Sequence, residues 1–382
     1  MTKPIRVGFI GLSSSSKVQY GGAWGRNGHL PYLKKSEHYT ITALCNSSQE
    51  SAKKAIKLHE LDADKVKAYG DPESLANDPD VDLVVVSVNV MEHYNLVKPA
   101  LLAGKSVFCE WPLASNLTQM KELTELAEQK KVKTILGLQG RNGAYNKAIR
   151  SFIGDKEGQF GQVLSTSLAS YSTFHGLANP KAIAYLMDLK SGGGIFTITA
   201  IHLLDTLTAA LGEISSSHTV LKNKRPTIAL MDSSFNVVEP AHPNNTPEHV
   251  LVHGELQGDI PFTFQARGGP PFKDTPAFDW RIYFQRGEVR VFGDQLLWLG
   301  GGIKVQAFDF VAKTVKDVDL DAFSKENDKD DVAVRLGLDA PADNVARLYE
   351  AFATGDTDKY LDFKQSLKWA EFIQDAYTAN GF

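Results

Sequence analysis

A histidine and an aspartate three residues apart are the strongest candidates for proton-transfer chemistry in this 382-residue chain. His202 and Asp205 follow three consecutive glycines, Gly192–Gly194, within a stretch of helical character. Side chains three positions apart on a helix lie on the same side, and the ordinary pKa of histidine lies close to neutrality. The two side chains could therefore exchange a proton with a ligand, although a lone histidine on a helix is usually structural. The alternative is a histidine that only packs inside the helix.

A serine-rich turn near the N-terminus predicts a site for the phosphates of a dinucleotide. The run Gly11–Ser16 (GLSSSS) keeps only the first glycine of the usual G-x-G-x-x-G pattern. The next glycines come later, at Gly21, Gly22 and Gly25. We expect a longer loop than usual, in which the cofactor is contacted by Gly11, Ser13 and Ser14 and capped by Trp24. The alternatives are a serine-rich surface turn and a tryptophan that only packs the loop.

The second strand-like run, Tyr39–Cys45, ends without the acid that usually binds the ribose 2′-hydroxyl of NAD. Asn46 and Ser47 follow it, and no arginine comes directly after them. Because a carboxylate is missing here, a 2′-phosphate would not be repelled. The sequence predicts that Asn46 and Ser47 contact the cofactor, and it leaves both NAD and NADP open.

Alternating strands and helices in the first 138 residues must position these groups. Such alternation is typical of a doubly wound parallel sheet with right-handed crossovers. Ser87, Asn89 and His93 lie around the end of the strongest strand, where we expect contact with the cofactor. The alternative is a polar strand end followed by a helix cap. The expected strands are Ile5–Leu12, Tyr39–Cys45, Val81–Val90, Ser106–Glu110 and Lys133–Leu138, and the expected helices are Gln49–His59, His93–Ala103 and Asn116–Lys130.

Longer strand-like runs follow one another after about residue 145, which predicts a largely antiparallel sheet. Helices are expected over Tyr145–Ile153, Ile195–Leu211, Ala342–Thr354 and Lys364–Ala379. The charged residues 322–333 are expected to form a surface loop. The expected strands are Val163–Ser172, His218–Leu221, His249–Leu256, Phe262–Ala266, Asp279–Phe284, Glu288–Phe292 and Lys304–Phe310.

Composition narrows the classes of function. A single hydrophobic core stops growing at roughly 250–300 residues, so this length predicts two domains. Lys and Arg number 41 against 45 Asp and Glu, a net charge of −4, which disfavours nucleic-acid binding. Two cysteines, the absence of metal-ligand spacing and the lack of a long apolar run predict a cytoplasmic protein without a metal or a membrane span. The strand-like start also does not look like a signal peptide.

Two runs in the chain resemble the Gfo/Idh/MocA oxidoreductase family. Leu101–Ala114 (LLAGKSVFCEWPLA) is similar to the family run ALxAGKHVxCEKPLA, and Gly192–Asp205 is similar to GGGxLxDxGxHxxD. The order and spacing of the matches extend over most of the chain, including the C-terminal helix. The resemblance implies an N-terminal Rossmann domain and a C-terminal α/β domain. The open, mostly antiparallel sheet of the second domain would have one face at the active site.

The departures from the family pattern concern the proton donors. Trp111 stands where the family has a lysine, Ile198 where it has an aspartate, and Ala200 where a glycine is usual. Hydride transfer between a carbonyl and an alcohol needs a group that exchanges the hydroxyl proton, and neither a tryptophan nor an isoleucine does so. Tyr185 and Lys190, shortly before the glycine run, are candidates for that role, and we take Tyr185 as the second catalytic residue.

A branch of this family, the fungal galactose-regulon repressor, offers a narrower resemblance. It implies that NAD(P) is bound and that a transcriptional activator's peptide occupies the cleft without turnover. The present chain is shorter than that repressor. The runs that carry the resemblance are Glu110–Pro112, Leu138–Arg141, Thr246–His249 and Arg267–Pro270.

The resemblance also assigns roles near the cofactor. It places Glu110 beside the nicotinamide ribose, makes Trp111 a flat wall, and allows a cis bond at Pro112. Gln139 would contact the cofactor, and Arg141 would hold an anionic substrate group. His202 would be catalytic, and His202 and Asp205 would line the substrate site. Tyr171 and His175 would lie near the mouth of the cleft. The alternatives are a strand-end turn, a core tryptophan and an ordinary surface charge.

The sequence thus predicts an α/β protein with a Rossmann domain over residues 1–140. Residues 141–382 would form a substrate and dimerisation domain, with an open β-sheet and a C-terminal helix that returns toward the Rossmann domain. The expected function is NAD(P)-dependent hydride transfer to or from a sugar, polyol or similar small polar substrate, by a homodimer or higher homo-oligomer. The alternatives are a repressor-like regulator without turnover and an enzyme acting on a substrate such as an imine.

Overall fold

The computed structural model describes residues 3–16, 23–172, 176–294, 301–326 and 329–382. At residues 325, 326, 329 and 330 it describes the backbone alone. Gly21, Gly22 and His175, named above, lie outside the described residues. The chain divides into two compact units. Unit 1 holds residues 1–138, 190–192 and 335–372, and unit 2 holds residues 139–189, 193–334 and 373–382. No helix in the described part of the chain is long and apolar enough to cross a membrane.

Unit 1 is built on a six-stranded sheet of order β3-β2-β1-β4-β5-β6 in which every pairing is parallel. The predicted doubly wound Rossmann sheet is therefore confirmed. The strand order reverses between β1 and β4, so their carboxyl ends form the crevice at which such sheets bind ligands. The strands are β1 (Ile5–Ile10), β2 (Tyr39–Cys45), β3 (Lys67–Tyr69), β4 (Leu83–Val86), β5 (Ser106–Glu110) and β6 (Thr134–Gly137).

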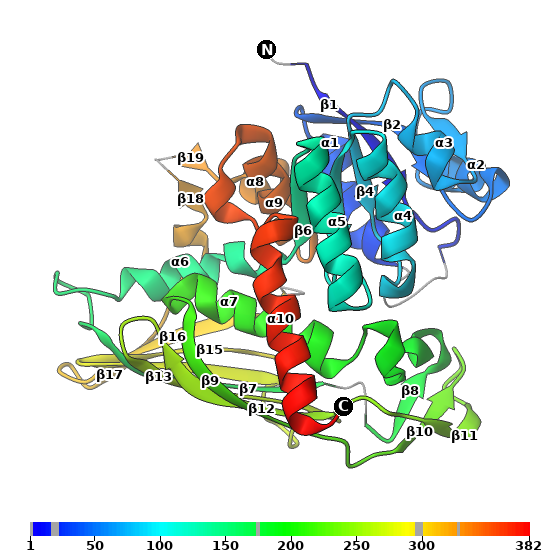
Figure 1. Cartoon of the computed structure of the whole chain (residues 1–382). Helices are drawn as coiled ribbons and strands as arrows, with labels where there is room; N and C mark the ends of the chain where they lie inside the picture. Colours follow the sequence, from blue (N-terminus) through cyan, green and yellow to red (C-terminus); the bar gives the residue numbers. More distant parts are fainter. Residues whose placement is uncertain (1–2, 17–22, 173–175, 295–300, 327–328) are drawn as a thin grey trace. The chain divides into compact units, whose positions relative to one another are not determined.

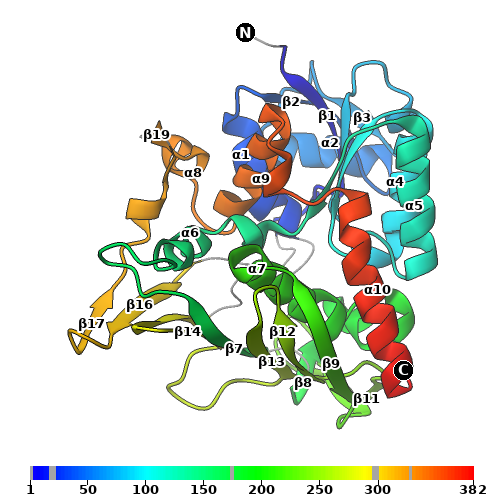
Figure 2. The same ribbon diagram turned by 60° about the vertical axis from the view of Figure 1, so that its left-hand side comes forward.

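Helices cover both faces of this sheet, which Figure 2 shows between α4 and α5 on one side and α1 and α9 on the other. Each β-strand of the sheet interior is almost continuously apolar, as burial on both faces requires. The helical elements of unit 1 are η2 (Gly25–His29), α1 (Leu30–Lys35), α2 (Gln49–Leu58), α3 (Pro72–Ala76), α4 (Val90–Leu102), α5 (Leu117–Lys130), α9 (Ala342–Thr354), η9 (Thr357–Lys359) and the first part of α10 (Phe363–Asn380).

Unit 2 contains an eight-stranded sheet of order β17-β16-β15-β14-β7-β13-β12-β9. All its pairings are antiparallel except that of β13 with β7, which confirms a mostly antiparallel sheet. The strands are β7 (Val163–Ser172), β9 (Ile214–Lys222), β12 (His249–Leu256), β13 (Ile260–Gly268), β14 (Phe278–Phe284), β15 (Gly287–Gly293), β16 (Lys304–Asp309) and β17 (Thr314–Asp317).

One face of this sheet is buried and the other is open. Along β14, Phe278, Trp280, Ile282 and Phe284 are buried and alternate with half-buried or exposed residues. Figure 1 shows α6 (Ala144–Ser151) and α7 (Ile201–Leu211) along the covered face. A π-helical turn, η6 (Ile195–Ala200), leads into α7, so the helix expected over Ile195–Leu211 is formed with an irregular first part.

A small sheet of order β11-β10-β8 and several short elements complete unit 2. The expectation of a plain loop over residues 322–333 was wrong, because this segment contains parts of a 3₁₀ turn, a two-stranded hairpin and the start of α8. Val332 and Ala333, at the end of this charged segment, are buried and attach it to the protein interior. The elements are β8 (Ala178–Pro180), η4 (Lys181–Met187), η5 (Leu189–Ser191), β10 (Thr227–Met231), β11 (Val237–Pro243), η8 (Asp321–Phe323), β18 (Lys325–Glu326), β19 (Lys329–Asp330) and α8 (Val332–Leu336).

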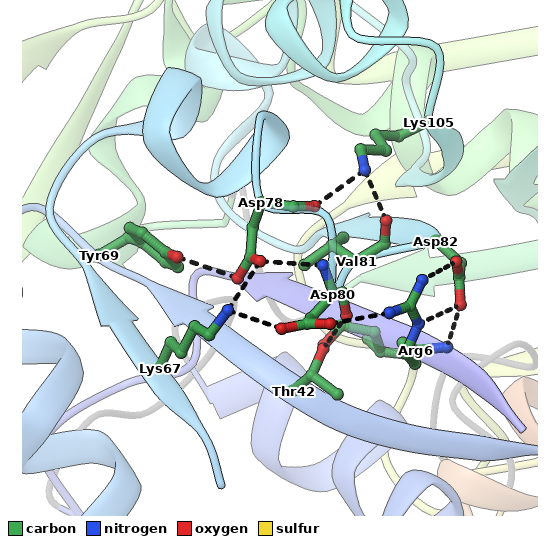
Figure 3. A network of polar contacts seen from close by, with 10 residues as sticks. Arg6, Thr42, Lys67, Tyr69, Asp78, Asp80, Val81, Asp82 and Lys105 are labelled. Atoms are coloured by element: carbon green, nitrogen blue, oxygen red, sulfur yellow. Dashed lines mark hydrogen bonds and ion pairs between the residues drawn. The ribbon is translucent and has the colours of Figure 1, made fainter.

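A charged network fixes the amino edge of the sheet in unit 1 (Figure 3). Arg6 donates to both carboxylate oxygens of Asp82, at 2.9 and 2.8 Å. Lys67 bridges Asp78 and Asp80 at 2.9 and 2.8 Å, and Lys105 donates to the carbonyl oxygens of Asp78 and Val81. Every carboxylate of the cluster is paired with a cation, so the cluster ties strand starts together and leaves the ligand-binding role to the opposite edge.

Candidate functional site

Gly11, the residue after β1, has a conformation and surroundings that only glycine satisfies. Its φ is +99°, in the region that side chains avoid. A Cβ atom placed there would lie 2.3 Å from the carbonyl oxygen of Ser87. The backbone of Gly11 therefore packs directly against the end of β4. Such a close approach is what a dinucleotide turn requires.

The serine loop after Gly11 is held by side chains from the β2–α2 connection and from α2 with its C-terminal cap. The amide nitrogen Nδ2 of Asn46 donates to the carbonyl oxygen of Leu12 at 2.9 Å. Ser51 Oγ donates to Ser14 Oγ at 3.1 Å, and a ring nitrogen of His59 lies 2.8 Å from the carbonyl oxygen of Ser13. The hydroxyl of Ser13 accepts from the backbone N–H of Ser15, which turns the loop on itself. The predicted phosphate-binding residues thus form one braced turn, and Ser47 is exposed beside it.

The end of β4 presents an unsatisfied hydroxyl. Ser87 is 5% exposed, and its Oγ has no hydrogen-bond partner among the described residues. Buried hydroxyls are nearly always hydrogen-bonded, so an orphaned one at a strand's carboxyl end points to a ligand. Asn89 is exposed, and its side chain does not cap α4. Both residues are therefore available to a cofactor.

His93, in contrast, has both ring nitrogens close to backbone carbonyl oxygens of the chain. Its Nδ1 lies 2.7 Å from the carbonyl oxygen of Pro112, and its Nε2 lies 3.2 Å from that of Val88. Complete burial lowers the pKa of this imidazole, so the ring is neutral and donates to one of the two carbonyls. His93 therefore links the end of β4 to the turn after β5.

A buried relay fixes Glu110 at the end of β5. His29 Nε2 lies 2.7 Å from Glu110 Oε1, and His29 Nδ1 lies 2.8 Å from the hydroxyl of Tyr349. Burial raises the pKa of Tyr349 well above its usual range, so its phenol donates to His29, which in turn donates to the carboxylate. The other carboxylate oxygen, Oε2, occupies space opened by Gly137, where a Cβ would lie only 2.6 Å away. The carboxylate is therefore held in one orientation.

The turn after Glu110 and the loop before η2 contribute aromatic groups. The peptide bond between Trp111 and Pro112 is cis, and Trp111 is 5% exposed. The indole of Trp24 packs on Gly28, and its Nε1 is buried without a hydrogen-bond partner in the described part of the chain. A buried indole N–H normally finds an acceptor. Trp24 therefore has a donor to offer a ligand.

These observations test whether unit 1 suits a dinucleotide. The glycine turn, the braced serine loop and two orphaned buried donors all lie along the segments that follow β1 and β4. The donor set is neutral and rich in hydroxyl and N–H groups, which suits phosphate and ribose oxygens. The residues present therefore fit the group that the Rossmann sheet implies.

In unit 2, the two charged residues expected to line a substrate site neutralise one another. Arg141, in η3 (Gln139–Asn142), donates to Asp205 of α7 with Nε–Oδ2 and Nη2–Oδ1 distances of 3.2 and 3.5 Å. The Asp205 side chain is 1% exposed and the Arg141 side chain 10%. Asn146 ties the same elements by donating to the carbonyl oxygens of Arg141 and Thr206. A buried pair of this kind fixes η3 to α7.

His202 lies one turn before Asp205 in α7 and is 5% exposed. Burial lowers the pKa of its imidazole to about 3, so it is neutral at physiological pH. A neutral imidazole donates or accepts a hydrogen bond, but its conjugate acid is too strong to persist near neutrality. His202 therefore suits polarising or orienting a substrate better than storing a proton.

Two further side chains of unit 2 have polar atoms to offer. Gln139 is 1% exposed, and neither its amide oxygen nor its amide nitrogen has a hydrogen-bond partner among the residues described. Tyr185 of η4 is half-buried, and burial raises the pKa of its phenol, which stays protonated. Lys190 is exposed. Within the described ranges, no group of three or more His, Cys, Asp or Glu side chains is arranged to hold a metal.

The sequence interpretation missed the residues that brace the site. Ser51 and His59 hold the serine loop, and His29 with Tyr349 orients Glu110. Ser51 had a local signal, since it lies in the first turn of a helix that follows a predicted strand. Tyr349 had none, because 320 residues of chain separate it from His29.

Comparisons with known proteins agree with this arrangement. Residues 5–138 match the oxidoreductase family with an NAD-binding Rossmann fold, and residues 146–293 match the C-terminal domain of Gal80p. The chain is 32% identical over 321 residues to the dehydrogenase aclE of Aspergillus oryzae, covering 82% of this chain and 84% of that protein. The chain belongs to the Gfo/Idh/MocA oxidoreductase family.

Regulators occur among the relatives of this family member. It is 26% identical over 400 residues to the galactose/lactose metabolism regulatory protein GAL80 of Saccharomyces cerevisiae, covering 99% of this chain and 88% of that protein. The structure of a super-repressor mutant of Gal80p from the same yeast has a TM-score of 0.82 at 24% identity, covering 99% and 96% of the two chains. Levoglucosan dehydrogenase in complex with NADH and levoglucosan has a TM-score of 0.72 at 15% identity, covering 98% of both chains. These likenesses establish the shared fold.

Proposed function

We propose that the protein is an NAD(P)-dependent oxidoreductase that transfers a hydride to or from a sugar, a polyol or a similar small polar compound. The observation that carries the proposal is the donor-lined crevice after β1 and β4, with Gly11 against Ser87 and the Ser14 loop braced by Ser51. The 32% identity with a dehydrogenase supports turnover over a purely regulatory role.

The cofactor would be held by unit 1. The loop residues Gly11, Ser13 and Ser14 would face the phosphates, and Asn46 and Ser47 the ribose at the end of β2. Ser87, Asn89 and Glu110 would serve the nicotinamide half, together with Trp24, Trp111 and Pro112. A bound nicotinamide would supply or accept the hydride.

The proton would be exchanged by Tyr185. Its phenol remains protonated because burial raises its pKa, so it can donate to a carbonyl oxygen as the adjacent carbon is reduced. His202, which burial keeps neutral, would orient that oxygen by a hydrogen bond. Arg141 and Asp205, already paired, would line the substrate site as a polar wall without net charge.

A specific observation favours a second candidate, a cofactor-binding regulator without turnover. Trp111 and Ile198 replace the family's lysine and aspartate, and His202 does not titrate near neutrality. The ordinary proton-transfer groups are therefore missing, and GAL80 is among the relatives. In that case the residues assigned to the substrate would contact a peptide of a transcriptional activator.

We also propose that the protein forms a homodimer or higher homo-oligomer through the open face of the eight-stranded sheet. This face carries a groove of about 680 Å³ lined by Tyr171, Leu251, His253, Arg267 and Phe272, among others. Leu251 is 43% and Phe272 80% exposed. Apolar side chains gathered around a groove on an open sheet are typical of an interaction surface.

The experiment that tests the enzymatic proposal combines cofactor binding with turnover. NADH and NADPH are titrated by fluorescence, and a panel of sugars, keto sugars and imines is then added while the absorbance of the reduced cofactor is followed. Tyr185→Phe should lower the rate at least about tenfold with unchanged cofactor affinity, as expected for loss of a general acid. The matched change Tyr360→Phe, a buried tyrosine of unit 1, should leave both quantities unchanged. Tight binding with no oxidation of NADH by any compound would instead support the regulator.

A further inference from the structure

The orientation of one side-chain amide at the end of β2 is fixed by its partners. Asn46 Nδ2 lies 2.9 Å from the carbonyl oxygen of Leu12 and 3.5 Å from Ser51 Oγ. A carbonyl oxygen only accepts hydrogen bonds, so the amide nitrogen, not the oxygen, must face Leu12. Ser51 gives its own proton to Ser14 Oγ at 3.1 Å, and its oxygen is therefore free to accept from Asn46.

This arrangement leaves Asn46 with one kind of polar atom to offer. Both amide hydrogens point into the protein, toward Leu12 and Ser51. The remaining atom, Oδ1, accepts no hydrogen bond from another described residue, and Asn46 is half-buried. Asn46 therefore presents an acceptor, and not a donor, at the position where a Rossmann sheet meets the ribose of its dinucleotide.

The two nicotinamide dinucleotides differ in chemistry at this ribose. A 2′-hydroxyl donates a hydrogen bond to an acceptor such as Oδ1. A 2′-phosphate carries more than one negative charge near neutrality and offers mainly acceptor oxygens. An acceptor facing acceptors is repulsive and leaves both desolvated without a partner.

Carboxylates near the end of β2 also disfavour a 2′-phosphate at this position, because like charges repel. Burial, together with the negative charges of Asp71 and Glu73, raises the pKa of the Cys45 thiol to about 12. Glu50, in the first turn of α2, has its pKa lowered by hydrogen bonds with the backbone and Ser48, so it is ionised. Lys53 and Lys54, the cations that act on Glu50, come three and four residues further along the chain. The strand end next to Asn46 thus lies within the electrostatic influence of two carboxylates, those of Asp71 and Glu73.

We propose that Asn46 is a specificity-determining residue that makes this site prefer NAD(H) over NADP(H), through Oδ1 accepting from the ribose 2′-hydroxyl. This inference rests on the proposed function, because it concerns the same cofactor site. It replaces the usual acid at the end of β2 by a neutral side chain whose orientation is set by Leu12 and Ser51. The hydrogen-bonded order Asn46–Ser51–Ser14 also leaves the proton of Ser14 available to a phosphate oxygen.

The test is direct measurement of affinity by titration calorimetry with NADH and with NADPH. The wild-type chain should bind NADH at least about tenfold more tightly, since a lost hydrogen bond to a neutral partner accounts for about fivefold and facing acceptors add to it. Asn46→Ala should weaken NADH about fivefold and change NADPH by less than about twofold. Ser47→Arg, at the neighbouring exposed position, should raise the affinity for NADPH relative to that for NADH, because an arginine there can pair with a 2′-phosphate.

A matched control separates specificity from stability. Asn116 caps α5 by accepting from the backbone N–H of Gln119, in the same unit but at a different helix. Asn116→Ala removes the same chemical group and should leave the NADH-to-NADPH ratio unchanged. Thermal unfolding of each variant shows whether it is folded. If Asn46→Ala is not folded, the proposal is decided by the ratio of NADH to NADPH affinity in the wild-type chain and by the effect of Ser47→Arg on that ratio.

The possible outcomes separate the two proposals. Equal binding of NADH and NADPH by the wild-type chain, or equal weakening of both by Asn46→Ala, overturns the role of Asn46 and leaves the oxidoreductase proposal standing. Tighter binding of NADPH overturns it as well. Failure to bind either dinucleotide overturns the proposed function itself, and this inference with it.

Discussion

The contact between Gly11 and Ser87 determines how closely the ends of β1 and β4 approach. A Cβ at Gly11 would lie 2.3 Å from the Ser87 carbonyl oxygen, and the backbone there has a φ of +99°. We expect Gly11→Ala to lower the free energy of unfolding by about 2–5 kcal/mol, the sum of overpacking and left-handed strain, and to abolish NADH binding. Chemical denaturation and fluorescence titration measure the two effects.

Gly104 provides the control for this substitution. It also has a positive φ, of +72°, but a Cβ there would meet nothing within 4 Å. Gly104→Ala should therefore cost only the conformational term of about 1–2 kcal/mol and retain NADH binding. Equal losses in the two variants, or unchanged cofactor affinity in Gly11→Ala, would show that the close contact has no role.

The buried imidazole of His202 predicts a defined loss of stability in acid. Its folded pKa is about 3, whereas an unfolded histidine titrates near 6.5. Between these values the unfolded chain binds more protons, so the free energy of unfolding falls as the pH decreases, by up to about 1.4 kcal/mol per pH unit for one group. His93, whose pKa is also lowered by burial, acts in the same direction.

His202→Gln should lower by about one the number of protons that the chain takes up when it unfolds in this pH range. Urea denaturation of both proteins between pH 6 and pH 4 should give a shallower slope for the variant, with a difference of about one proton. Identical slopes would mean that His202 is protonated in the folded protein, and its assignment as a neutral orienting group would then fail.

Position along the chain was sufficient to predict which residues lie at the strand ends, but not which residues brace them. Gly11, Asn46 and Ser87 were predicted because each follows a strand of a parallel sheet, and such ends converge at one edge. The partners of Glu110 come from His29 and from Tyr349 of α9. Contacts between residues so far apart in sequence follow from tertiary packing, which no local pattern encodes.

The attachment of η3 to α7 depends on the buried pair of Arg141 and Asp205. Removing one partner leaves an uncompensated charge in the interior, so Arg141→Ala and Asp205→Ala should each cost about 3–5 kcal/mol. The double variant should cost clearly less than the sum of the two. Denaturation of the four proteins forms the cycle. Additive losses would show that the two side chains act independently, and Arg141 would then be free to bind an anionic substrate.

Whole elements were predicted where their pattern was long and regular. The ten residues of β7 (Val163–Ser172) match the expected strand, because their burial alternates along a half-open sheet. β3 has three residues, too few for a periodic signal, and is recognised only by its pairing with β2. The charged segment 322–333 was assigned to a loop, since its composition outweighed the two apolar residues at its end.

The association of whole molecules is predicted to involve the open sheet of unit 2. Leu251→Asp places a charge among the residues that line the groove on this face, and burying it in an interface would be costly. We expect the wild-type protein to sediment as a dimer or larger species and Leu251→Asp to sediment as a monomer. Leu58→Asp, the same change at a 39% exposed position of unit 1, should not alter the sedimentation. A monomeric wild-type protein would contradict the proposed assembly.

Hydride transfer is the central claim, and following the transferred atom tests it most directly. The protein would be incubated with NADH deuterated at the transferring position and a mixture of sugars, keto sugars and other small carbonyl compounds, and the products would be analysed by mass spectrometry. We predict that one class of compound gains a single deuterium, and that Tyr185→Phe slows this labelling. If NADH binds but no compound becomes labelled, the oxidoreductase proposal is contradicted and the regulator is favoured.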